Sequence, residues 1–511
     1  MSEREGWRGP VLWALAYFVF QVAVTIVGSV HGYGYFIDEL YYIACARHLD
    51  WGYVDHPPLA PALLRLNLAL FGDSVTAIRL PSALAGALTV ALAGFITLRM
   101  GGGRFAVALA AVSIITAPIF LVLFNFFSMN SLEILLWTAC IAVAMVMVER
   151  NDPRLWVVFG FVAGLSLENK HTVAVLAVTI LVGVLCTTQR RLLWSPWLLV
   201  GGVVAFVLFL PNLFWQVQNG FPSLEFYRNA TLYKNRALSP PRVLLNQVLF
   251  MNPGVMLVWL AGLYAFWKRA ALRFVSVAFL LMLVVLIVTA SSRPDRLGGV
   301  YPVLFAGGAF AIERRFASTR ARGTFLACGV IGGLAFLPLA VPLFSPATVA
   351  RYLVALGVDV QMESGEGKQA QLPQWLADRF GWEQLVKDVT TVYESLPDEE
   401  KKDATILSPS YGHAGAIELF GRDLPPVISP HNSYFFWGRE SAKRLSRGVA
   451  ITLGYDADDL RDVYRTVERV AVYDCDFCMP WRDQMGIYVA RGPKLAPEEV
   501  GTAWEGAKHF E

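Results

Sequence analysis

The chain has 511 residues, of which 56% are hydrophobic and 16% charged, and its formal net charge is +3 at pH 7. A soluble protein of this length could bury so many apolar side chains only with an implausibly apolar surface. The small net charge, without a basic block, also excludes the strongly positive surface typical of nucleic-acid-binding proteins. Repeated apolar runs of about 20 residues match the thickness of a hydrocarbon core, so the sequence predicts a polytopic α-helical membrane protein.

The first predicted span, residues 11–30, is too long for the core of a signal peptide and lacks a small-residue cleavage site, so we expect it to stay in the membrane. Ten further apolar runs bring the expected total to about eleven transmembrane helices. These runs are residues 76–98, 104–124, 131–148, 154–167, 171–186, 194–213, 247–267, 272–290, 297–312 and 323–344. The run 154–167 is short, and we expect it to be tilted, broken or partly re-entrant.

The positions of Lys and Arg in short loops predict the orientation of these spans. Alternate loops, including the segment before the first span, hold Arg4, Arg8, Arg99, Arg104, Arg150, Arg154, Arg190, Arg191, Lys268, Arg269, Arg273, Arg314, Arg315, Arg320 and Arg322. We therefore expect this side, with the N-terminus, to be cytoplasmic. Nearly all other ionisable residues near the spans then fall on the outer side.

The polar loop after the first span is the most informative stretch, because charge at the edge of a bilayer is expensive to hold and usually serves chemistry or transport. It contains Phe36-Ile37-Asp38-Glu39-Leu40-Tyr41-Tyr42. Adjacent residues on a helix diverge by about 100°, so one of Asp38 and Glu39 can meet a substrate while the other is held by the protein. Alternatively, the pair caps a short helix over residues 40–49. The position directly outside a span favours a functional role.

A second candidate motif in this region is Asp55-His56-Pro57-Pro58. The two prolines prevent a regular helix from running through Asp55 and His56. An aspartate and a histidine can bind a divalent cation, and a histidine can also hydrogen-bond a phosphate. This tetrapeptide is common in loops, so it gains weight only from its closeness to Asp38 in the sequence.

Further candidates lie at the predicted outer ends of later spans. Ser128–Glu133 opens the fourth span, and Glu168–His171 opens the sixth. Lys170 and His171, at a helix N-terminus, could hold an anionic head group. Alternatively, Lys170 only reaches water from the end of its span.

Cations and aromatic side chains in two outer loops add to this set. Arg293 and Arg296 in the last short outer loop offer cations for a phosphate, and the loop 215–243 could guide a lipid phosphate or only anchor the chain. Acids for a base and cations for a leaving phosphate suit transfer of a sugar from a lipid-phosphate donor. The pattern permits this reaction without selecting it.

From about Ser345 the apolar runs shorten and turn signals appear, so we predict two domains, a transmembrane domain over residues 1–344 and an outer domain over 345–511. Strand-like stretches at 404–407, 449–453, 469–473 and 487–490 alternate with helical patterns near 382–396 and 456–467, which indicates a small α/β domain. Cys475 and Cys478 form a C-x-x-C without a second metal-ligand pair, so we expect either a disulfide or two buried thiols. His413 and the segment His431-Asn432-Ser433 are candidates for acceptor contact, although ordinary loop histidines are commoner.

As a set, these motifs resemble the GT-C superfamily of integral-membrane glycosyltransferases. The resemblance is to the bacterial group related to protein O-mannosyltransferases and the lipid A aminoarabinose transferase (glycosyltransferase family 39-like). The segments Phe36–Tyr42 and Gly52–Leu59 are similar to its acidic first-loop motif and its acidic-basic-Pro-Pro motif. Further similar blocks are Ser128–Glu133, Glu168–His171, Pro211–Gln216 and Tyr301–Leu304.

The resemblance implies a transferase of the bacterial inner membrane with a periplasmic C-terminal domain. It would move a sugar from a polyprenyl-phosphate donor to an envelope glycolipid, glycan or protein. Asp38 would then be the general base, with Glu39 supporting the loop, and Asp55 would lie near a divalent metal. His56 stands where the aminoarabinose transferase has a lysine that contacts phosphate. Tyr42, Glu133, Lys170, His171, Arg293 and Arg296 complete the expected substrate site.

Two other functions would also use charges at the outer side. A transporter or flippase of lipid-linked sugars should show internal repeats with discontinuous helices, and the sequence shows no convincing repeat. A catalytically silent assembly partner that binds through its tail is the third alternative, and the intact Asp38 disfavours it.

Overall fold

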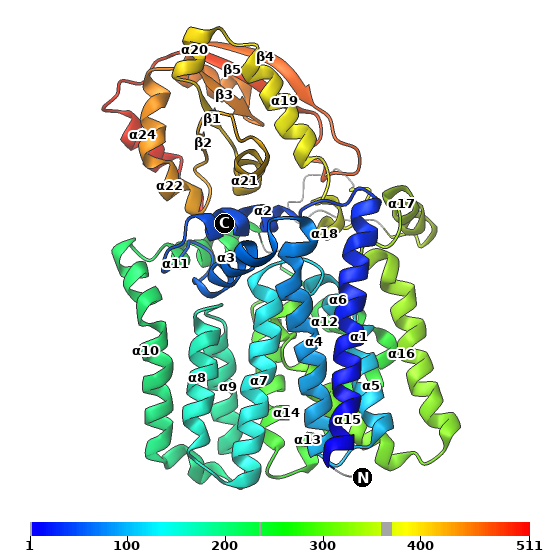
Figure 1. The fold of residues 1–511 in the computed structure, drawn as a ribbon. Coiled ribbons are helices and arrows are strands. Elements are labelled where there is room, and N and C mark those ends of the chain that lie inside the picture. The colour runs from blue at the N-terminus through cyan, green and yellow to red at the C-terminus, as the bar shows by residue number, and fades with distance from the viewer. Residues whose placement is uncertain (1–2, 235–236, 359–369) are drawn as a thin grey trace. The chain divides into compact units, whose positions relative to one another are not determined.

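The computed structural model describes residues 3–234, 237–358 and 370–511 (Figure 1). The chain forms two compact units. Unit 1 contains Met1–Gly28, His56–Gln218 and Asn235–Leu343. Unit 2 contains Ser29–Asp55, Asn219–Lys234 and Phe344–Glu511. The polar loop after the first span therefore belongs to the same unit as the C-terminal residues.

Unit 1 is a bundle of apolar helices (Figure 1). Those long and apolar enough to cross a membrane are residues Trp7–Val30 of α1 (Glu3–Val30), α4 (Val75–Arg99), α7 (Met129–Arg150), α10 (Pro196–Gln218) and α16 (Thr319–Ala340). Shorter helices pack among them: α3 (Leu59–Phe71), α5 (Arg104–Ile115), α6 (Pro118–Leu123), α8 (Leu155–Leu167), α9 (Val173–Leu185), α14 (Arg273–Val288) and α15 (Tyr301–Arg315). The polytopic helical architecture predicted from the sequence is thus confirmed, while the number of spans stays a prediction.

Two predicted spans are not continuous helices. The run 104–124 is divided between α5 and α6, because Pro118 begins a new helix after Thr116 and Ala117. The run 247–267 overlaps α12 (Pro240–Phe250) and α13 (Met256–Lys268), and the chain bends by 87° at the break between them. Asn252 lies at this break with φ 69°, immediately before Pro253.

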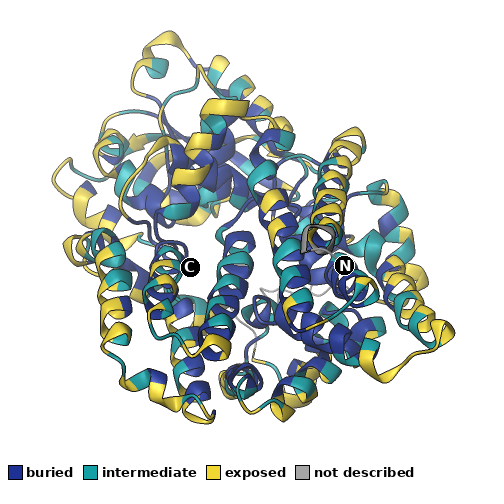
Figure 2. Cartoon of the chain, turned by 60° about the horizontal axis from the view of Figure 1, so that its bottom comes forward, coloured by how far each residue is buried: buried dark blue, intermediate teal, exposed yellow. Residues whose placement is uncertain are grey.

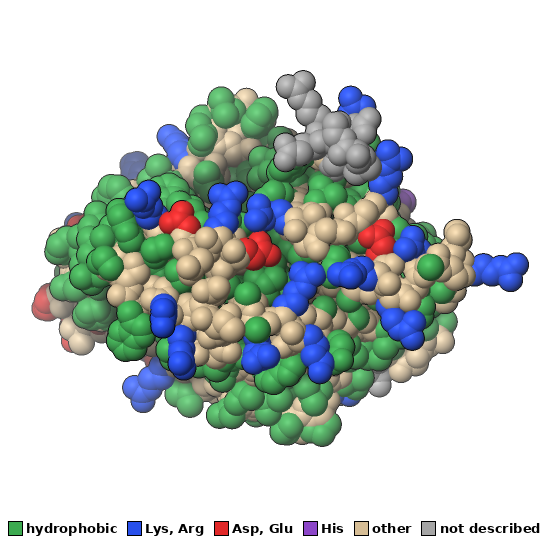
Figure 3. Space-filling view, turned by 90° about the horizontal axis from the view of Figure 1, so that it is seen from below, with side chains coloured by type: hydrophobic (Ala, Val, Ile, Leu, Met, Phe, Trp, Pro, Cys, Tyr) green, Lys and Arg blue, Asp and Glu red, His purple; other side chains and the backbone are tan. Residues whose placement is uncertain are grey.

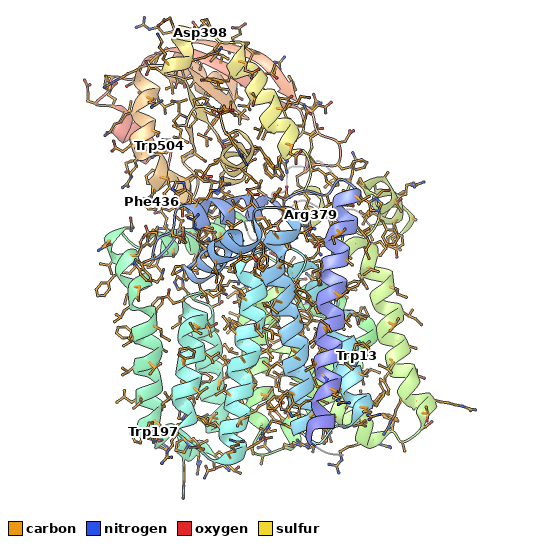
Figure 4. The ribbon with its side chains drawn as sticks, in the orientation of Figure 1. Trp13, Trp197, Arg379, Asp398, Phe436 and Trp504 are labelled. Carbon is orange, nitrogen blue, oxygen red and sulfur yellow. A yellow bond between two sulfur atoms is a disulfide. The ribbon has the colours of Figure 1, made fainter. Side chains whose placement is uncertain are left out.

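The unit 1 helices have exposed outward faces (Figure 2), and large apolar side chains lie on them, as a lipid-exposed surface requires. Leu15 of α1, Phe206 of α10 and Leu334 of α16 are all exposed. Trp13 and Trp197 lie on α1 and at the start of α10, respectively (Figure 4). Tryptophans near helix ends are typical of the membrane–water interface.

One end of unit 1 collects basic side chains, and Figure 3 shows this face with many Lys and Arg and few acidic residues. It is formed where α1, α5, α8, α10, α14 and α16 begin. Its exposed members include Arg8, Arg99, Arg104, Arg150, Arg154, Arg190, Arg191, Lys268, Arg314, Arg315 and Arg320. The loops that the sequence grouped by charge therefore do meet at one face.

Unit 2 contains a five-stranded sheet of order β2-β1-β3-β5-β4. Its strands are β1 (Thr405–Leu407), β2 (Val427–Ile428), β3 (Ala450–Leu453), β4 (Tyr464–Tyr473) and β5 (Met485–Pro493). β1 pairs in parallel with β2 and β3, and β5 runs antiparallel to both β3 and β4. This arrangement confirms the α/β tail.

Helices accompany this sheet in unit 2: α17 (Pro346–Ala355), α18 (Gln374–Ala377), α19 (Trp382–Glu394), α20 (Asp398–Lys402), α21 (Tyr411–Phe420), α22 (Ser433–Ala442), α23 (Ala457–Val463) and α24 (Val500–Gly506). The predicted helix over 456–467 is too long, because β4 begins at Tyr464. Trp504 of α24 stacks on Phe435 of α22 with ring centroids 5.9 Å apart, and Figure 4 labels Trp504. Cys475 and Cys478 form a disulfide, the first of the two predicted states.

The first loop packs into the core of unit 2. Its helix, α2 (Ile37–Arg47), lies against α21, and its tyrosines Tyr41 and Tyr53 are buried together with Ala414 and Tyr434. Val54 is buried in a second cluster, next to Phe435 and Trp504. The segment 219–234 belongs to the same unit and contains α11 (Pro222–Asn229). The loop that carries the predicted acids is therefore supported by side chains of the C-terminal residues.

Candidate active site

Glu39 and Asp38, adjacent in α2, have different surroundings. The Glu39 side chain is fully buried, and its Oε2 accepts a 2.8 Å hydrogen bond from the backbone N–H of Phe36. This bond satisfies one of the amides that a helix N-terminus leaves unpaired, so Glu39 caps α2. Asp38 is half-buried, and its Oδ1 accepts a 2.9 Å hydrogen bond from the Tyr411 hydroxyl. The capping role that the sequence allowed for the pair thus falls to Glu39.

Asp55 is also held by a tyrosine. The Tyr41 hydroxyl lies 2.9 Å from Asp55 Oδ1 and 2.8 Å from Ser433 Oγ. A single hydroxyl proton serves one acceptor, and the carboxylate is the stronger one, so Tyr41 donates to Asp55 and Ser433 donates to Tyr41. The backbone N–H of Val54 completes the group by donating to Ser433 Oγ at 3.2 Å.

Unit 2 thereby brings several acids close to one phenol. Burial raises the pKa of Tyr411 well above its ordinary value, and the charges of Asp38, Asp55 and Asp378 raise it further. Tyr411 consequently keeps its proton and acts only as a donor to Asp38 at any physiological pH. Tyr42, another predicted site residue, lies in α2 and is buried.

Unit 1 holds a second polar group at the end of the bundle opposite to its basic face (Figure 1). Lys170 Nζ lies 2.7 Å from Glu133 Oε2 and donates to Asn130 Oδ1 at 2.8 Å. The Thr172 hydroxyl donates to the other oxygen of Glu133. The side chains of Lys170 and Glu133 are only 13% and 7% exposed. Lys170 is therefore paired with a carboxylate inside the protein and does not simply extend to water.

Histidines lie near this ion pair. His171 Nε2 is 3.0 Å from Asn212 Oδ1, and His56 is close enough to affect the ionisation of His171. His56 is fully buried, and its Nδ1 donates to the carbonyl of Pro57 at 3.0 Å. A carbonyl only accepts, so Nδ1 of His56 carries a proton in this contact.

The two predicted arginines lie in the loop that leads into α15. Burial lowers the pKa of the Arg296 guanidinium, and the charges of Asp295 and Glu133 act in the opposite direction. Arg296 is therefore near the Glu133–Lys170 pair, and Arg293 is its neighbour. This loop is held by Gln247 of α12, which donates to the carbonyl of Pro294 at 3.4 Å and accepts from the Tyr301 hydroxyl at 3.0 Å.

The expected metal site has no complete ligand set among the described residues, where no three His, Cys, Asp or Glu side chains cluster as a metal would require. Asp55 Oδ1 is already an acceptor for Tyr41. The divalent cation therefore stays a prediction, and no chemical step below uses it.

Two residues of this region escaped the sequence analysis: Tyr411 and Asp378. Ser433 was proposed only for acceptor contact, and its hydrogen bond to Tyr41 was not foreseen. Both Tyr411 and Ser433 follow strands too short to show a period-2 pattern, β1 and β2. The available signal was the pair of Ser-Pro turns at 408–409 and 429–430, since groups after parallel strands gather at one sheet edge. Asp378 is buried beside Arg482, with Oδ1 3.5 Å from Nη1, and nothing in its local sequence indicates this.

Comparison with known proteins agrees with this architecture. Residues 55–215 match the family described as Dolichyl-phosphate-mannose-protein mannosyltransferase. No protein of curated function matches the sequence.

Solved structures share the fold. The crystal structure of ArnT from Cupriavidus metallidurans bound to undecaprenyl phosphate is similar with a TM-score of 0.61 and 16% identity, over 93% of this chain and 98% of that chain. The apo state of the same protein gives a TM-score of 0.57 and 17% identity over the same shares. At such identities the likeness establishes the fold alone, which is the predicted combination of apolar helices with a small C-terminal α/β region.

Proposed function

We propose that this protein transfers a sugar from a polyprenyl-phosphate-linked donor to a hydroxyl or amine of an envelope acceptor, with Asp38 as the general base. The observation that carries the proposal is that the two adjacent acids differ in burial and in hydrogen-bond partner. Glu39 is buried and used as a helix cap, whereas Asp38 is half-buried and held by a tyrosine donor. A partly exposed, oriented carboxylate can accept a proton from an incoming nucleophile.

In this reaction the acceptor oxygen or nitrogen attacks the anomeric carbon of the sugar, and the bond from that carbon to the phosphate oxygen breaks. The acceptor proton passes to Asp38, and the phosphate leaves on the polyprenyl chain. The developing phosphate charge needs cations, for which Arg293 and Arg296 are the candidates. Because Nδ1 of His56 donates to the Pro57 carbonyl, a phosphate contact of this histidine would use Nε2. Lys170 is partly neutralised by Glu133, so it contributes less net charge.

Two observations support a lipid-linked donor. The fold is shared with ArnT, whose crystal structure holds undecaprenyl phosphate. In addition, α10 and α16 expose broad apolar faces on which a polyprenyl chain could lie. We place the basic face of unit 1 in the cytoplasm and the acceptor on the outer side, in the inner membrane of a bacterium, because Lys and Arg concentrate on cytoplasmic loops.

The substitution Asp38→Asn tests this proposal, because it keeps the size of the side chain and removes its basicity. Membranes from a strain without the gene supply donor and unmodified acceptor, and mass spectrometry of their lipids and proteins detects the product. Wild-type protein should add the sugar, and Asp38→Asn should slow transfer by about 10²- to 10⁴-fold. Asp50→Asn, the same change at an exposed position of the same loop, is the control and should transfer normally. Normal turnover by Asp38→Asn would remove Asp38 from the role of base.

A further inference from the structure

The base proposed above is held by a residue from the C-terminal part of the chain. Tyr411, the first residue of α21, donates its hydroxyl proton to Asp38 Oδ1 at 2.9 Å. The two residues lie in the same compact unit although they are far apart in the sequence. Hydrogen bonds to a charged acceptor are shorter and stronger than neutral ones, so this contact fixes the carboxylate more firmly than packing alone would.

A second tyrosine makes the same contact with the second candidate acid. The rings of Tyr41 and Tyr411 lie 4.8 Å apart between centroids. Tyr411 donates to Asp38, and Tyr41 donates to Asp55. Ser433, the first residue of α22, holds the Tyr41 hydroxyl in turn. Two acids of the first loop are thus each oriented by one member of a packed tyrosine pair.

The position of this pair in the sheet explains why it can support a site. β1 lies between β2 and β3, so the chain moves from β1 to one neighbour and then crosses to the other. β1 and β2 are parallel neighbours, so the residues that follow their carboxyl ends gather at one edge of the sheet, which is where ligands bind in sheets of this kind. Tyr411 and Ser433 are the first residues of α21 and α22, the helices that follow these two strands.

We propose, on the basis of the proposed function, that Tyr411 is a positioning residue for Asp38 and that the C-terminal domain thereby forms part of the catalytic apparatus. Its hydroxyl holds Oδ1 in place and favours the ionised form of the carboxylate, which is the form that accepts a proton. Tyr411 itself neither touches the sugar nor moves a proton.

The titratable groups around Tyr411 are defined by its neighbours. Asp38 and Tyr41 face it from α2, Asp55 from the end of the first loop, and Asp378 from the end of α18. His431, in the turn before α22, places its ring 4.7 Å from that of Tyr411. Two of these groups, Asp55 and Asp378, are acids whose negative charges oppose the ionisation of Asp38, so losing the hydroxyl donor leaves the Asp38 carboxylate easier to protonate.

The test is Tyr411→Phe, which removes one oxygen atom. In the membrane assay described above, this variant should lower kcat by about 10- to 100-fold, as expected for the loss of one charge-assisted hydrogen bond. The acidic limb of its pH–rate profile should move to higher pH, because protonation of Asp38 becomes easier. Its Kd for undecaprenyl phosphate, used as the probe of the donor site, should not change.

Tyr434→Phe is the matched control. Tyr434 is a buried tyrosine of the same domain that packs near Tyr41, but its hydroxyl donates to Glu418 Oε2 at 2.6 Å and not to either candidate acid. It should retain the wild-type pH–rate profile. If the acidic limb of the pH–rate profile moved to higher pH in both variants, the cause would be a general loosening of the domain, and the inference would be overturned.

Other outcomes separate the inference from the proposed function. If the wild-type protein adds no sugar, or if Asp38→Asn transfers normally, the proposed function fails. If Asp38→Asn is inactive while Tyr411→Phe has wild-type kcat and pH dependence, only the role of Tyr411 fails. Should Tyr411→Phe not fold, 3,5-difluorotyrosine at position 411 keeps the shape and strengthens the donor. The acidic limb should then move to lower pH, and an unchanged limb would refute the inference.

Discussion

Gly415 offers a way to displace Tyr411 without altering its hydroxyl. It lies on α21, one helical turn after Tyr411, at the point where this helix meets α2. A Cβ atom at position 415 would lie 2.9 Å from both the carbonyl carbon and the oxygen of Leu40. These are backbone atoms of α2, so no side-chain rotation can relieve the contact. The glycine is therefore needed for the close approach of the two helices.

The size of the displacement follows from ordinary contact distances. Non-bonded carbon atoms are most stable at about 3.5–4.0 Å, so Gly415→Ala must separate the two helices locally by roughly 0.6 Å or more. Overpacking of this kind costs about 1–3 kcal/mol, offset in part by the better helix propensity of alanine, about 1 kcal/mol. The hydrogen bond from Tyr411 to Asp38, now 2.9 Å, would lengthen beyond effective range. A displacement of about 1 Å can reduce catalysis by about 10²-fold.

We therefore expect Gly415→Ala to lose transfer activity by about 10- to 100-fold while its apparent Tm in detergent falls only modestly. The assay is product formation in donor-containing membranes, with activity normalised to folded protein. Gly438→Ala is the control. Gly438 lies on α22, and a Cβ atom there would lie 2.9 Å from Trp504 Cζ2 of α24, so the variant is also overpacked but does not press on α2. Full activity in Gly415→Ala, or an equal loss in Gly438→Ala, would refute the idea that the α2–α21 contact sets the geometry of the base.

The remaining predictions concern two buried ion pairs. Lys170→Met or Glu133→Gln alone should destabilise the protein by about 3–5 kcal/mol because each leaves a buried charge unpaired, and the double variant should lose less. A double-mutant cycle in Tm checks this, and additive losses would contradict it. Burial raises the pKa of Asp378 to about 6, with Arg482 opposing the shift. Between about pH 4 and 6, the Asp378 carboxyl is then protonated in the folded state and ionised in the unfolded state. The free energy of unfolding should therefore fall by about 3 kcal/mol as the pH rises through that range. Asp378→Asn should remove this slope from Tm against pH, and a persistent slope would assign it to another group.

Hydropathy predicted the membrane helices because one physical quantity, the thickness of the apolar core, sets their length. It failed where local chemistry interrupts a uniformly apolar run. Asn252 lies in the break between α12 and α13 with a positive φ, and its side chain donates to Thr116 Oγ1 at 3.0 Å and to the carbonyl of Gly329 at 2.8 Å. The Asn-Pro dipeptide at 252–253 was a usable signal for this break.

The tail was harder to predict because its elements are short and support one another. α21 is rich in glycine and alanine, so it lacks the apolar period by which an amphipathic helix is recognised. Its glycines make sense only once α2 is placed against it: a Cβ at Gly412 would lie 2.3 Å from Ile37 Cγ1. That contact joins segments far apart in the sequence, and no local pattern encodes it.

The division of labour between the two acids follows from the length of α2. A helix of 11 residues is marginal by itself and needs both a cap and a packing partner. Glu39 supplies the cap, and α21 supplies the partner. A carboxylate that must stay partly exposed for proton transfer cannot also be buried as a cap, so the neighbouring position in the same turn is left for that role. Asp38 then needs a donor from outside its own helix to fix its orientation, and Tyr411 on the supporting helix is the group placed to provide it.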